Sequence, residues 1–417
     1  MTRLTASLPV LILLALSLGC GGSERIENGR VGEVEEELVL RVATFNIEDL
    51  RTAELLDSTR PRPRMAAAML QQIRPDILLI NEIAYDQSGA PSWVEGQDPG
   101  QNGQRFADLF LAHPQGDGLE PIRYLAFMRP VNTGVASGLD LDNDGRVSAE
   151  PPKWKGDDRG DEQSATDRAY GQDAWGFGTF PGQYGMALLV REGLEVLQAD
   201  VRTFRTFAWS RMPGAMQPED PATGQSWYSP DEWSVLRLSS KSHWDVPIRL
   251  PGGVVLHILA SHPTPPAFDG PEMRNRKRNH DEIRFWADYL EGADYIQDDG
   301  GRTGGLPEDR SFVLLGDLNA DPEEGNSLDE AVDRLLEHSR VNNDFTPEAD
   351  SSAAAELPHL DRQDTAGWGL RVDYVLPSAN LEILDGGVWR RRDESGVEVS
   401  DHFPVWLDIA VPIVDKP

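Results

Sequence analysis

The chain has 417 residues and a formal net charge of −31, with 70 acidic against 39 basic side chains. This balance excludes a protein that is held on nucleic acid by a broad basic surface, because Lys and Arg contacts to phosphates dominate such binding. An enzyme that uses a cation to meet a phosphate is still allowed, and acidic chains can help to hold divalent metals. The 39 Gly and 30 Pro indicate long, turn-rich loops.

The N-terminus has the layout of a secretory signal. Arg3 precedes an apolar run over residues 8–18, and Gly19 and Cys20 follow. A run of about 11 residues is too short to span a bilayer. Cys20 is the single cysteine, so there is no internal disulfide. Its position resembles a bacterial lipoprotein signal over residues 1–20, with Ser17 as a departure where an aliphatic residue is usual. We expect an extracytoplasmic lipoprotein, periplasmic or at the cell surface, anchored to the membrane through Cys20, with secretion as the alternative.

Residues 21–37 are Gly-rich and then acidic, which predicts a solvated tether before a single domain over 38–412. The domain opens with an apolar strand at 38–45 that ends in Asn46. A helix is predicted over 63–73, and a second buried strand at 76–80 runs into Glu82. This β–α–β order predicts neighbouring strands with Asn46 and Glu82 at corresponding ends. A carboxylate and an amide placed there form a plausible site for a hard metal ion, although Glu82 taken alone favours a solvent-facing strand end.

Two loop-rich insertions are predicted, at about 86–180 and 205–250. The first contains Asp140, Asp142 and Asp144 followed by Gly145, which is the alternating acidic pattern of a calcium-binding loop. The twelfth position of that loop, where an acid is usual, is Pro151. We expect a structural calcium site, with an acidic turn as the alternative. A strand follows the first insertion at 184–190.

The strand predicted at 254–260 delivers His262, which can donate a proton or stabilise charge, or can have a structural role. A dense basic island lies beyond it, at residues 274–280 of this acidic chain. We expect Arg274, Arg278 and Asn279 to bind an anionic substrate, phosphate above all. The alternative is a solvated helix start, because Asn279 and Glu282 resemble a capping box.

A further motif follows a buried strand at 311–316, where Asp317 and Asn319 stand at alternate positions; a Gly-Asp turn after a strand is also common in structural roles. Period-two geometry places both side chains on one side of the chain, where they can bind a hydrated cation or orient a water. Asp373 lies in a strand at 371–376, and another strand is predicted at 388–391. Asp401 and His402 precede a last strand at 405–409.

These polar residues fall at or beside predicted strands, mostly at their ends. In an α/β sheet, strand ends at one edge converge on a common crevice where ligands bind. Two histidines with carboxylates and amides, and without Cys, indicate Mg²⁺ or Mn²⁺ rather than structural zinc. In-line attack of water on a phosphate ester suits this set, because it needs a base, cationic charge over the phosphate oxygens and help for the leaving group.

The order of the motifs resembles the endonuclease/exonuclease/phosphatase superfamily, which groups deoxyribonucleases, apurinic endonucleases, inositol-phosphate phosphatases and sphingomyelinases. The motifs that carry the resemblance run from Asn46 to His402: Phe-Asn46-Ile, Asn-Glu82, Ser-His262-Pro, Gly-Asp317-Leu-Asn319, Asp373-Tyr and Ser-Asp401-His402. The resemblance implies a single α/β domain, a four-layered α/β sandwich in which two packed mixed β-sheets are flanked by helices. The two insertions have no counterpart in the smallest members.

The resemblance also implies a role for each matching residue. Glu82 is expected to be the principal metal ligand, with Asn46 and Asp401 nearby. Asp317 is expected to activate the attacking water and Asn319 to contact the scissile phosphate. His402, oriented by Asp373, is expected to act as base or phosphate contact, and His262 to give acid or electrostatic help. Asn81 replaces the Gln that often precedes the metal-binding Glu.

We therefore expect a monomeric, divalent-metal-dependent phosphoesterase that hydrolyses phosphodiesters such as nucleic acid. Phosphomonoesters, phospholipids and small phosphodiesters are alternative substrates on the same scaffold. A non-catalytic surface-binding protein is the competing class, and the presence of both histidines and all the acids argues against it. Fold alone does not fix function, so the substrate stays open.

Overall fold

The computed structural model describes residues 36–152, 163–328, 330–390 and 397–413. Residues 1–20, over which the lipoprotein signal is predicted, and Cys20 among them, lie outside the described residues. The predicted tether does so as far as residue 35, while its last two residues, Glu36 and Glu37, begin strand β1. Of the described helices, none has both the length and the apolar character needed to cross a membrane.

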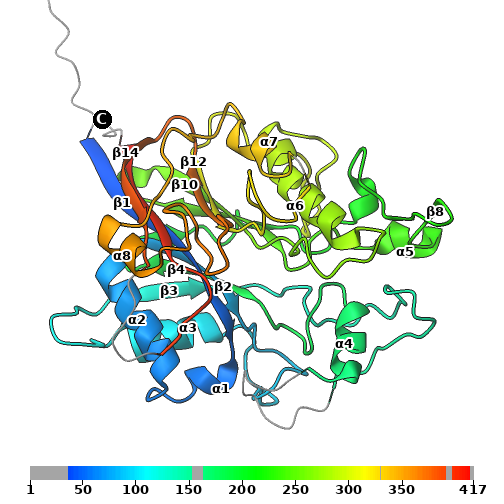
Figure 1. The fold of residues 1–417 in the computed structure, drawn as a ribbon. Coiled ribbons are helices and arrows are strands. Elements are labelled where there is room, and N and C mark those ends of the chain that lie inside the picture. The colour runs from blue at the N-terminus through cyan, green and yellow to red at the C-terminus, as the bar shows by residue number, and fades with distance from the viewer. Residues whose placement is uncertain (1–35, 153–162, 329, 391–396, 414–417) are drawn as a thin grey trace, which may run out of the picture. The chain divides into compact units, whose positions relative to one another are not determined.

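Two mixed six-stranded sheets form the centre of the domain (Figure 1). The strands of the first sheet, in spatial order, are β13 (Glu382–Val388), β14 (Val405–Ile413), β1 (Glu36–Leu50), β2 (Ile77–Ile83), β4 (Met186–Arg191) and β3 (Tyr124–Phe127). Those of the second are β12 (Asp373–Pro377), β11 (Phe312–Asp317), β10 (Val255–Ser261), β9 (His243–Arg249) and β5 (Glu195–Val196), with β6 (Arg202–Thr203) also paired to β9. A separate hairpin joins β7 (Glu219–Asp220) to β8 (Gln225–Ser226).

The parallel pairs are β1 with β2 and β10 with β11. The helices are short apart from two: α2 (Pro61–Ile73) and α6 (Arg274–Leu290). The other helical segments are α1 (Thr52–Leu55), α3 (Asn102–Phe106), η1 (Ala107–Leu111), α4 (Ala165–Gln172), η2 (Trp209–Arg211), α5 (Pro230–Val235), η3 (Pro251–Gly253), α7 (Asp333–Leu336) and α8 (Ser351–Glu356).

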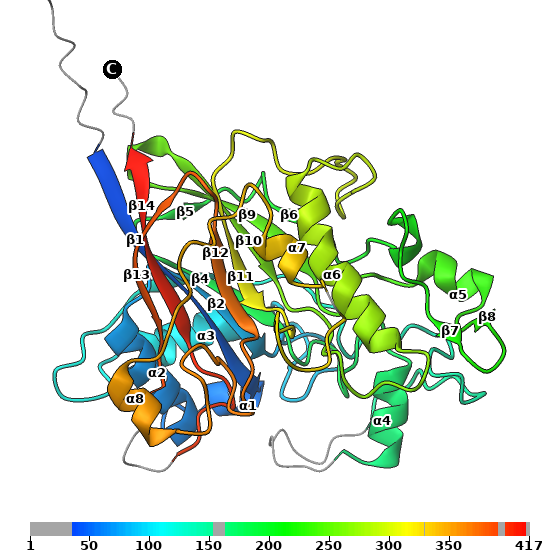
Figure 2. The same ribbon diagram turned by 45° about the horizontal axis from the view of Figure 1, so that its top comes forward.

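Three buried apolar clusters show that the predicted four-layered sandwich is correct. The middle cluster joins the facing sides of the two sheets, for example Val42 and Leu79 of the first with Ile258 and Leu315 of the second. A second cluster packs α2 and η1 on the outer face of the first sheet. The third packs α6 and α7 on the outer face of the second, and Figures 1 and 2 show these helices on their respective sides. Burial of apolar surface between layers is the dominant stabilising contribution.

Most predicted strands and the helix over 63–73 are found within a few residues of their expected ends, but three differences matter. The predicted insertions each contain a strand of a central sheet, β3 in the first and β9 in the second. The strand expected at 388–391 is wrong, because β13 ends at Val388. Strand β9 contains Pro247, a residue that is unfavourable inside a sheet; it lies between the short β5 and β6 pairings, where the neighbouring strand is interrupted.

Candidate active site

The ends of strands from both sheets bring the predicted polar residues together. Asn46 and Glu82 come from the parallel strands β1 and β2, in which Asn46 pairs with Asn81, so they lie at corresponding ends as predicted. The second sheet supplies Asp317 at the end of β11, His262 after β10 and Asp373 at the start of β12. Asp401 and His402 come from the segment before β14.

Asn81 ties the two sheets to each other at this edge. Its Oδ1 accepts a hydrogen bond from the backbone N–H of Asp317 (3.3 Å), and its Nδ2 donates to the carbonyl of Ser261 (3.5 Å). Asn81 is fully buried, so both contacts are shielded from water. The residue before Glu82 therefore has a structural role here: it sets the ends of β10 and β11 against the first sheet.

The Asp317 carboxylate is the centre of the group. Its Oδ2 accepts a hydrogen bond from Asn46 Nδ2 (2.9 Å) and lies 3.4 Å from His262 Nε2 and 3.7 Å from His402 Nε2. Asn46 Nδ2 also donates to Glu82 Oε1 (3.2 Å), so one amide holds two carboxylates. Burial raises the pKa of Asp317 to about 6, although the charge of His402 opposes this. A carboxylate with such a pKa is suited to taking a proton from water near neutral pH.

His402 is held from both sides. Its Nδ1 lies 2.8 Å from Oδ2 of Asp373, and the ring of Trp368 meets it edge-on with the ring centroids 4.9 Å apart. Burial disfavours the imidazolium, but the carboxylates of Asp373 and Asp317 outweigh this and raise the pKa of His402 to about 10. The charged form can donate from Nε2 to an anion, so of the two predicted roles this electrostatic setting favours phosphate contact.

His262 has the opposite electrostatic setting. The side chain is buried, and burial, followed by the charges of Lys241 and His402, lowers the pKa of His262 well below its usual value. Its Nε2 faces Asp317 and, at 3.9 Å, Glu82, while its buried Nδ1 has no hydrogen-bond partner among the described residues. A neutral imidazole with one nitrogen on Asp317 can orient that carboxylate or pass on a proton.

Asn319 lies beside Asp317, although not through the strand geometry predicted. Strand β11 ends at Asp317, and Asn319 adopts a left-handed backbone conformation with φ of 53°. Its backbone N–H donates to Asp317 Oδ1 (2.8 Å), and its Nδ2 donates to the carbonyl of Pro263 (3.2 Å). Glu48, Asp49 and Glu82 are left-handed as well, with φ of 55°, 48° and 65°. Such conformations are unfavourable for residues other than glycine and collect at functional sites.

Glu82 and Asp401 are the two carboxylates that are predicted to hold a metal ion. The backbone N–H of Asp49 donates to Glu82 Oε2 (3.0 Å), and burial, with Asp49 adding to it, raises the pKa of Glu82 to about 7. Asp401 is partly exposed, its carboxylate lies 4.0 Å from His402, and its backbone N–H donates to Glu48 (3.1 Å). Carboxylate oxygens with excess negative charge are ligands that Mg²⁺ or Mn²⁺ accepts.

The role of Asn46 and the grouping of the other possible metal ligands differ from the prediction. Asn46 directs its amide nitrogen to the carboxylates, and its Oδ1 accepts from the backbone N–H of Glu48 (2.9 Å), so in this arrangement it holds Glu82 rather than offering an oxygen. The side chains of Asp317, Asp373 and His402 place one ligand atom each within 4.8 Å of one another. These three side chains are therefore a second group that could hold a metal ion.

The basic island does not form a free cationic patch, which differs from the prediction. It lies in α6, where Arg278 donates to the backbone carbonyls of Leu238, Trp175 and Arg237. Arg274 donates to the carbonyl of Leu141 and to Gln172. These guanidinium groups hold the two insertions against the helix, because backbone carbonyls in loops need donors when they are buried.

Asn279 is likewise a structural residue, and the capping box expected with Glu282 is wrong, because α6 begins at Arg274. Both side chains are fully buried in the middle of the helix. Asn279 Nδ2 donates to the carbonyls of Thr264 and Leu318 (2.8 and 2.9 Å). The Glu282 carboxylate accepts from the backbone N–H groups of Ser240 and Thr264 (2.7 and 2.6 Å). Helix α6 therefore fixes the segments that carry His262 and Asp317.

The predicted calcium loop lies apart from this group. Ligand oxygens of Asp140, Asp142 and Asp144 come within 4.8 Å of one another, and all three carboxylates also accept from backbone N–H groups of the same loop. Such local hydrogen bonds also occur in acidic turns without an ion. Calcium binding there stays a prediction.

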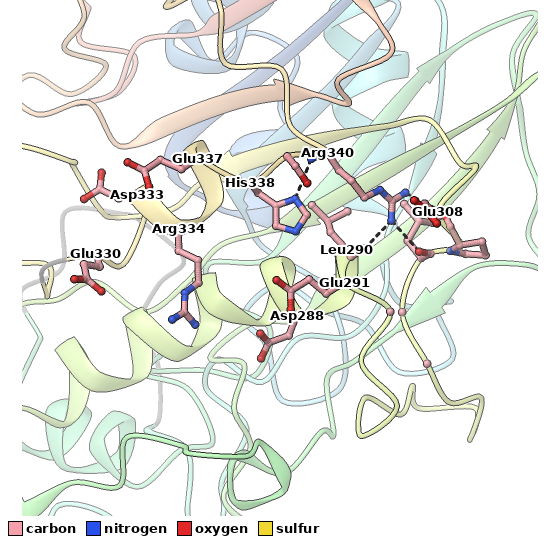
Figure 3. A pocket seen from close by; sticks show the side chains of 16 residues that line it. Asp288, Leu290, Glu291, Glu308, Glu330, Asp333, Arg334, Glu337, His338 and Arg340 are labelled. Atoms are coloured by element: carbon pink, nitrogen blue, oxygen red, sulfur yellow. Dashed lines mark hydrogen bonds between the residues drawn. The ribbon is translucent and has the colours of Figure 1, made fainter.

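A large cavity of about 1270 Å³ lies elsewhere, beside the C-terminal half of α6 and around α7 (Figure 3). Six of its sixteen lining residues are acidic, and Arg340 is held by four backbone carbonyls, those of Leu290, Leu306, Pro307 and Arg310. It shares no residue with the group around Asp317. The converging titratable side chains, rather than cavity size, therefore mark the candidate active site.

The structure adds residues that sequence reasoning missed. Lys241 is buried beside the site, Trp368 packs on His402, and Glu48 contacts the backbone of Asp401. Glu48 could have been found, since it stands two residues after Asn46 at the same strand end. Lys241 and Trp368 lie in loop-like stretches whose patterns do not indicate which side chains turn inward.

A model of the Endonuclease/Exonuclease/phosphatase family matches residues 43–402. A sequence comparison with curated proteins gives no match. Similar solved structures include an endonuclease/exonuclease/phosphatase from Beutenbergia cavernae (18% identity, 90% of this chain and 72% of that chain, TM-score 0.46). Others are a family protein from Bacteroides thetaiotaomicron (11%, 90% and 96%, TM-score 0.43) and the human Nocturnin catalytic domain with bound sulfate (14%, 90% and 96%, TM-score 0.44).

Proposed function

Because the chain belongs to the endonuclease/exonuclease/phosphatase family, whose members are phosphoester hydrolases, we propose that it is a divalent-metal-dependent phosphodiesterase with nucleic acid as its leading substrate class. The observation that carries the proposal is the convergence of Asn46, His262 and His402 on one buried oxygen of Asp317. This arrangement supports attack by an activated water, since it combines a base with donors for phosphate oxygens.

Each residue has a part in the proposed reaction. Asp317 orients the water and takes its proton as the new phosphorus–oxygen bond forms. His402, held by Asp373, donates to a phosphate oxygen. Asn319 makes a further contact with the same phosphate. A divalent cation held by Glu82 and Asp401, with Asn46 beside them, would supply positive charge over the phosphate oxygens. His262 keeps Asp317 oriented. As the bond between phosphorus and the leaving oxygen breaks, that oxygen takes a proton, and His262 can pass to it the proton that Asp317 has received.

The test is hydrolysis of four substrates in parallel: plasmid DNA, bis-(p-nitrophenyl) phosphate, p-nitrophenyl phosphate and phosphatidylcholine vesicles. Each is incubated with Mg²⁺, Mn²⁺, Ca²⁺ or EDTA, and Asp317→Asn serves as the control for contaminating enzymes. We expect cleavage of DNA and of the diester with Mg²⁺ or Mn²⁺ and none with EDTA. Cleavage of p-nitrophenyl phosphate alone would indicate a phosphomonoesterase, and cleavage of the lipid alone a phospholipid phosphodiesterase. Either result would overturn nucleic acid as the substrate class. Silence of the folded protein in every reaction would overturn the hydrolase proposal in favour of a binding role.

We also propose that the protein is exported and anchored through a lipid on Cys20, on the basis of the signal pattern described above. Replacement by Ser should move the protein from the membrane fraction to the soluble fraction, because a lipid chain is the anchor in this proposal. Fractionation is followed by immunoblotting of the wild type and Cys20→Ser. Membrane association that does not change in the variant contradicts the anchor, and a cytoplasmic wild type contradicts export.

A further inference from the structure

Lys241 is a buried lysine whose side chain is poorly compensated. It lies two residues before β9 and is only 5% exposed. Its Nζ donates to the carbonyl of Pro263 at 3.3 Å, and within the described part of the chain it forms no ion pair. Lysine is almost never fully buried without a charged partner, because removing an ammonium from water costs several kcal/mol. The side chain therefore needs an explanation other than packing.

The local fold does not require the ammonium. The backbone around Lys241 is fixed by other contacts: its carbonyl accepts from Asn132 N–H (2.9 Å), and the preceding N–H of Ser240 donates to Glu282 (2.7 Å). An apolar or neutral side chain at this position would leave these hydrogen bonds in place. The buried carboxylate of Glu282 offsets part of the positive charge, and the charges of Glu82 and Asp317 at the candidate site also act on it.

The position of the ammonium connects it to the candidate active site. The carbonyl of Pro263 accepts hydrogen bonds from both Lys241 Nζ and Asn319 Nδ2, so the two donors lie side by side. Pro263 directly follows His262, whose Nε2 lies 3.4 Å from Asp317. An ammonium has three N–H groups, and Pro263 uses one of them. The charge of Lys241 acts on Glu282 and also on Glu82, Asp317 and His262 of the candidate site.

We propose that Lys241 binds a non-bridging oxygen of the substrate phosphate, next to Asn319. The proposal deepens the phosphoesterase function and rests on it for the identity of the substrate, but binding of a phosphate anion can be measured without turnover. A fixed ammonium in a water-poor site stabilises developing charge on a phosphate without reorganisation. It also offsets part of the excess negative charge of the carboxylates that an anionic substrate would otherwise meet.

The test compares Lys241→Gln with the matched control Lys277→Gln. Gln at 241 can still donate to the carbonyl of Pro263, so it removes the charge and keeps the structural contact. Lys277 is partly buried and, like Lys241, donates to a backbone carbonyl, that of Gln217 (3.5 Å), but it lies on α6 against the second insertion. Binding of inorganic phosphate is measured by calorimetry with and without Mg²⁺, and kcat is measured on bis-(p-nitrophenyl) phosphate.

We expect Lys241→Gln to raise the dissociation constant for phosphate at least tenfold and to lower kcat by about 10²-fold, with both values unchanged in Lys277→Gln. Phosphate affinity equal to wild type in folded Lys241→Gln would overturn the proposal. If that variant does not fold, Lys241→Arg is measured instead; it keeps the charge and should retain phosphate binding, and loss of binding in folded Lys241→Arg would also overturn it. If the wild type binds phosphate through Lys241 but cleaves no phosphate ester, the proposed phosphoesterase function is wrong and the phosphate-binding role of Lys241 stands. If the protein hydrolyses the ester and Lys241→Gln changes neither kcat nor the dissociation constant for phosphate, the proposed role of Lys241 is wrong and the phosphoesterase function stands.

Discussion

Asp317→Asn and His402→Ala are each expected to lower kcat on a phosphodiester by about 10³-fold or more. The Asn side chain preserves the shape of Asp317 and its contact with the backbone N–H of Asn319 but cannot take a proton from water. His402→Ala removes the donor that Asp373 holds at 2.8 Å. Because both groups act on one reacting centre, the double variant should be little worse than either single one. Steady-state kinetics with saturating Mg²⁺ measure the effect.

The thermal stability of the Asp317 and His402 variants distinguishes a role in the reaction from a role in the fold. Burial makes the charged form of Asp317 unfavourable, so Asp317→Asn should unfold cooperatively at a Tm equal to or above that of wild type. His113→Ala is the control for histidine removal, since His113 is exposed and lies outside the site. Activity within a few-fold of wild type in either Asp317→Asn or His402→Ala would refute the assignment, and so would loss of activity that merely follows unfolding.

Glu82→Gln is expected to abolish the stabilisation of the protein by Mg²⁺ or Mn²⁺ and to lower kcat by about 10³-fold. The folded-state pKa of Glu82 is raised to about 7 from 4.5, chiefly by burial. The neutral form of Glu82 therefore contributes stability to the folded protein below about pH 4.5. This contribution falls as the pH rises and is lost above about pH 7, where Glu82 is ionised. At pH 8 and in EDTA, Glu82→Gln should have a Tm no lower than that of wild type. A cation at 100 times its Kd should then stabilise the wild type by about 3 kcal/mol and the variant not at all.

The matched control for this experiment is Glu337→Gln, which removes one acidic charge from the separate cavity near α7. It should show the wild-type response to metal, because its carboxylate lies outside the group around Asp317. Tm is recorded by differential scanning calorimetry over a metal titration for all three proteins. If Mg²⁺ or Mn²⁺ raises the Tm of Glu82→Gln as much as that of wild type, Glu82 does not hold the cation. If the rise is lost in Glu337→Gln as well, the effect is not specific to Glu82.

The sequence predicts this site well wherever a residue follows directly from a strand. Buried apolar runs identify β1, β2, β10 and β11, and a strand of known direction places its last side chain at a known edge of the sheet. Asn46, Glu82, His262 and Asp317 could therefore be brought together before any coordinates. The four-layered sandwich itself came from the motif order, since apolar periodicity does not say how two sheets stack.

Tertiary contacts decide the parts that the sequence did not predict. Pro247 argues locally against a strand, yet β9 tolerates it where neighbouring pairing is interrupted. The basic island is predicted from the sequence to bind an anionic substrate, yet Arg278 donates to backbone carbonyls of two distant segments. Lys241 reads as an ordinary surface lysine. In each case the deciding partner lies tens of residues away, and no local pattern records it.

The left-handed residues at the site have a consequence for protein engineering. Glu48, Asp49, Glu82 and Asn319 hold chemically useful side chains where the backbone favours glycine, at a cost of about 1 kcal/mol each. A library selected for thermal stability alone would therefore enrich glycine at these four positions, and the surviving proteins would be heat-resistant and inert. Selection schemes for this chain need to score turnover alongside survival on heating, because here the two select in opposite directions.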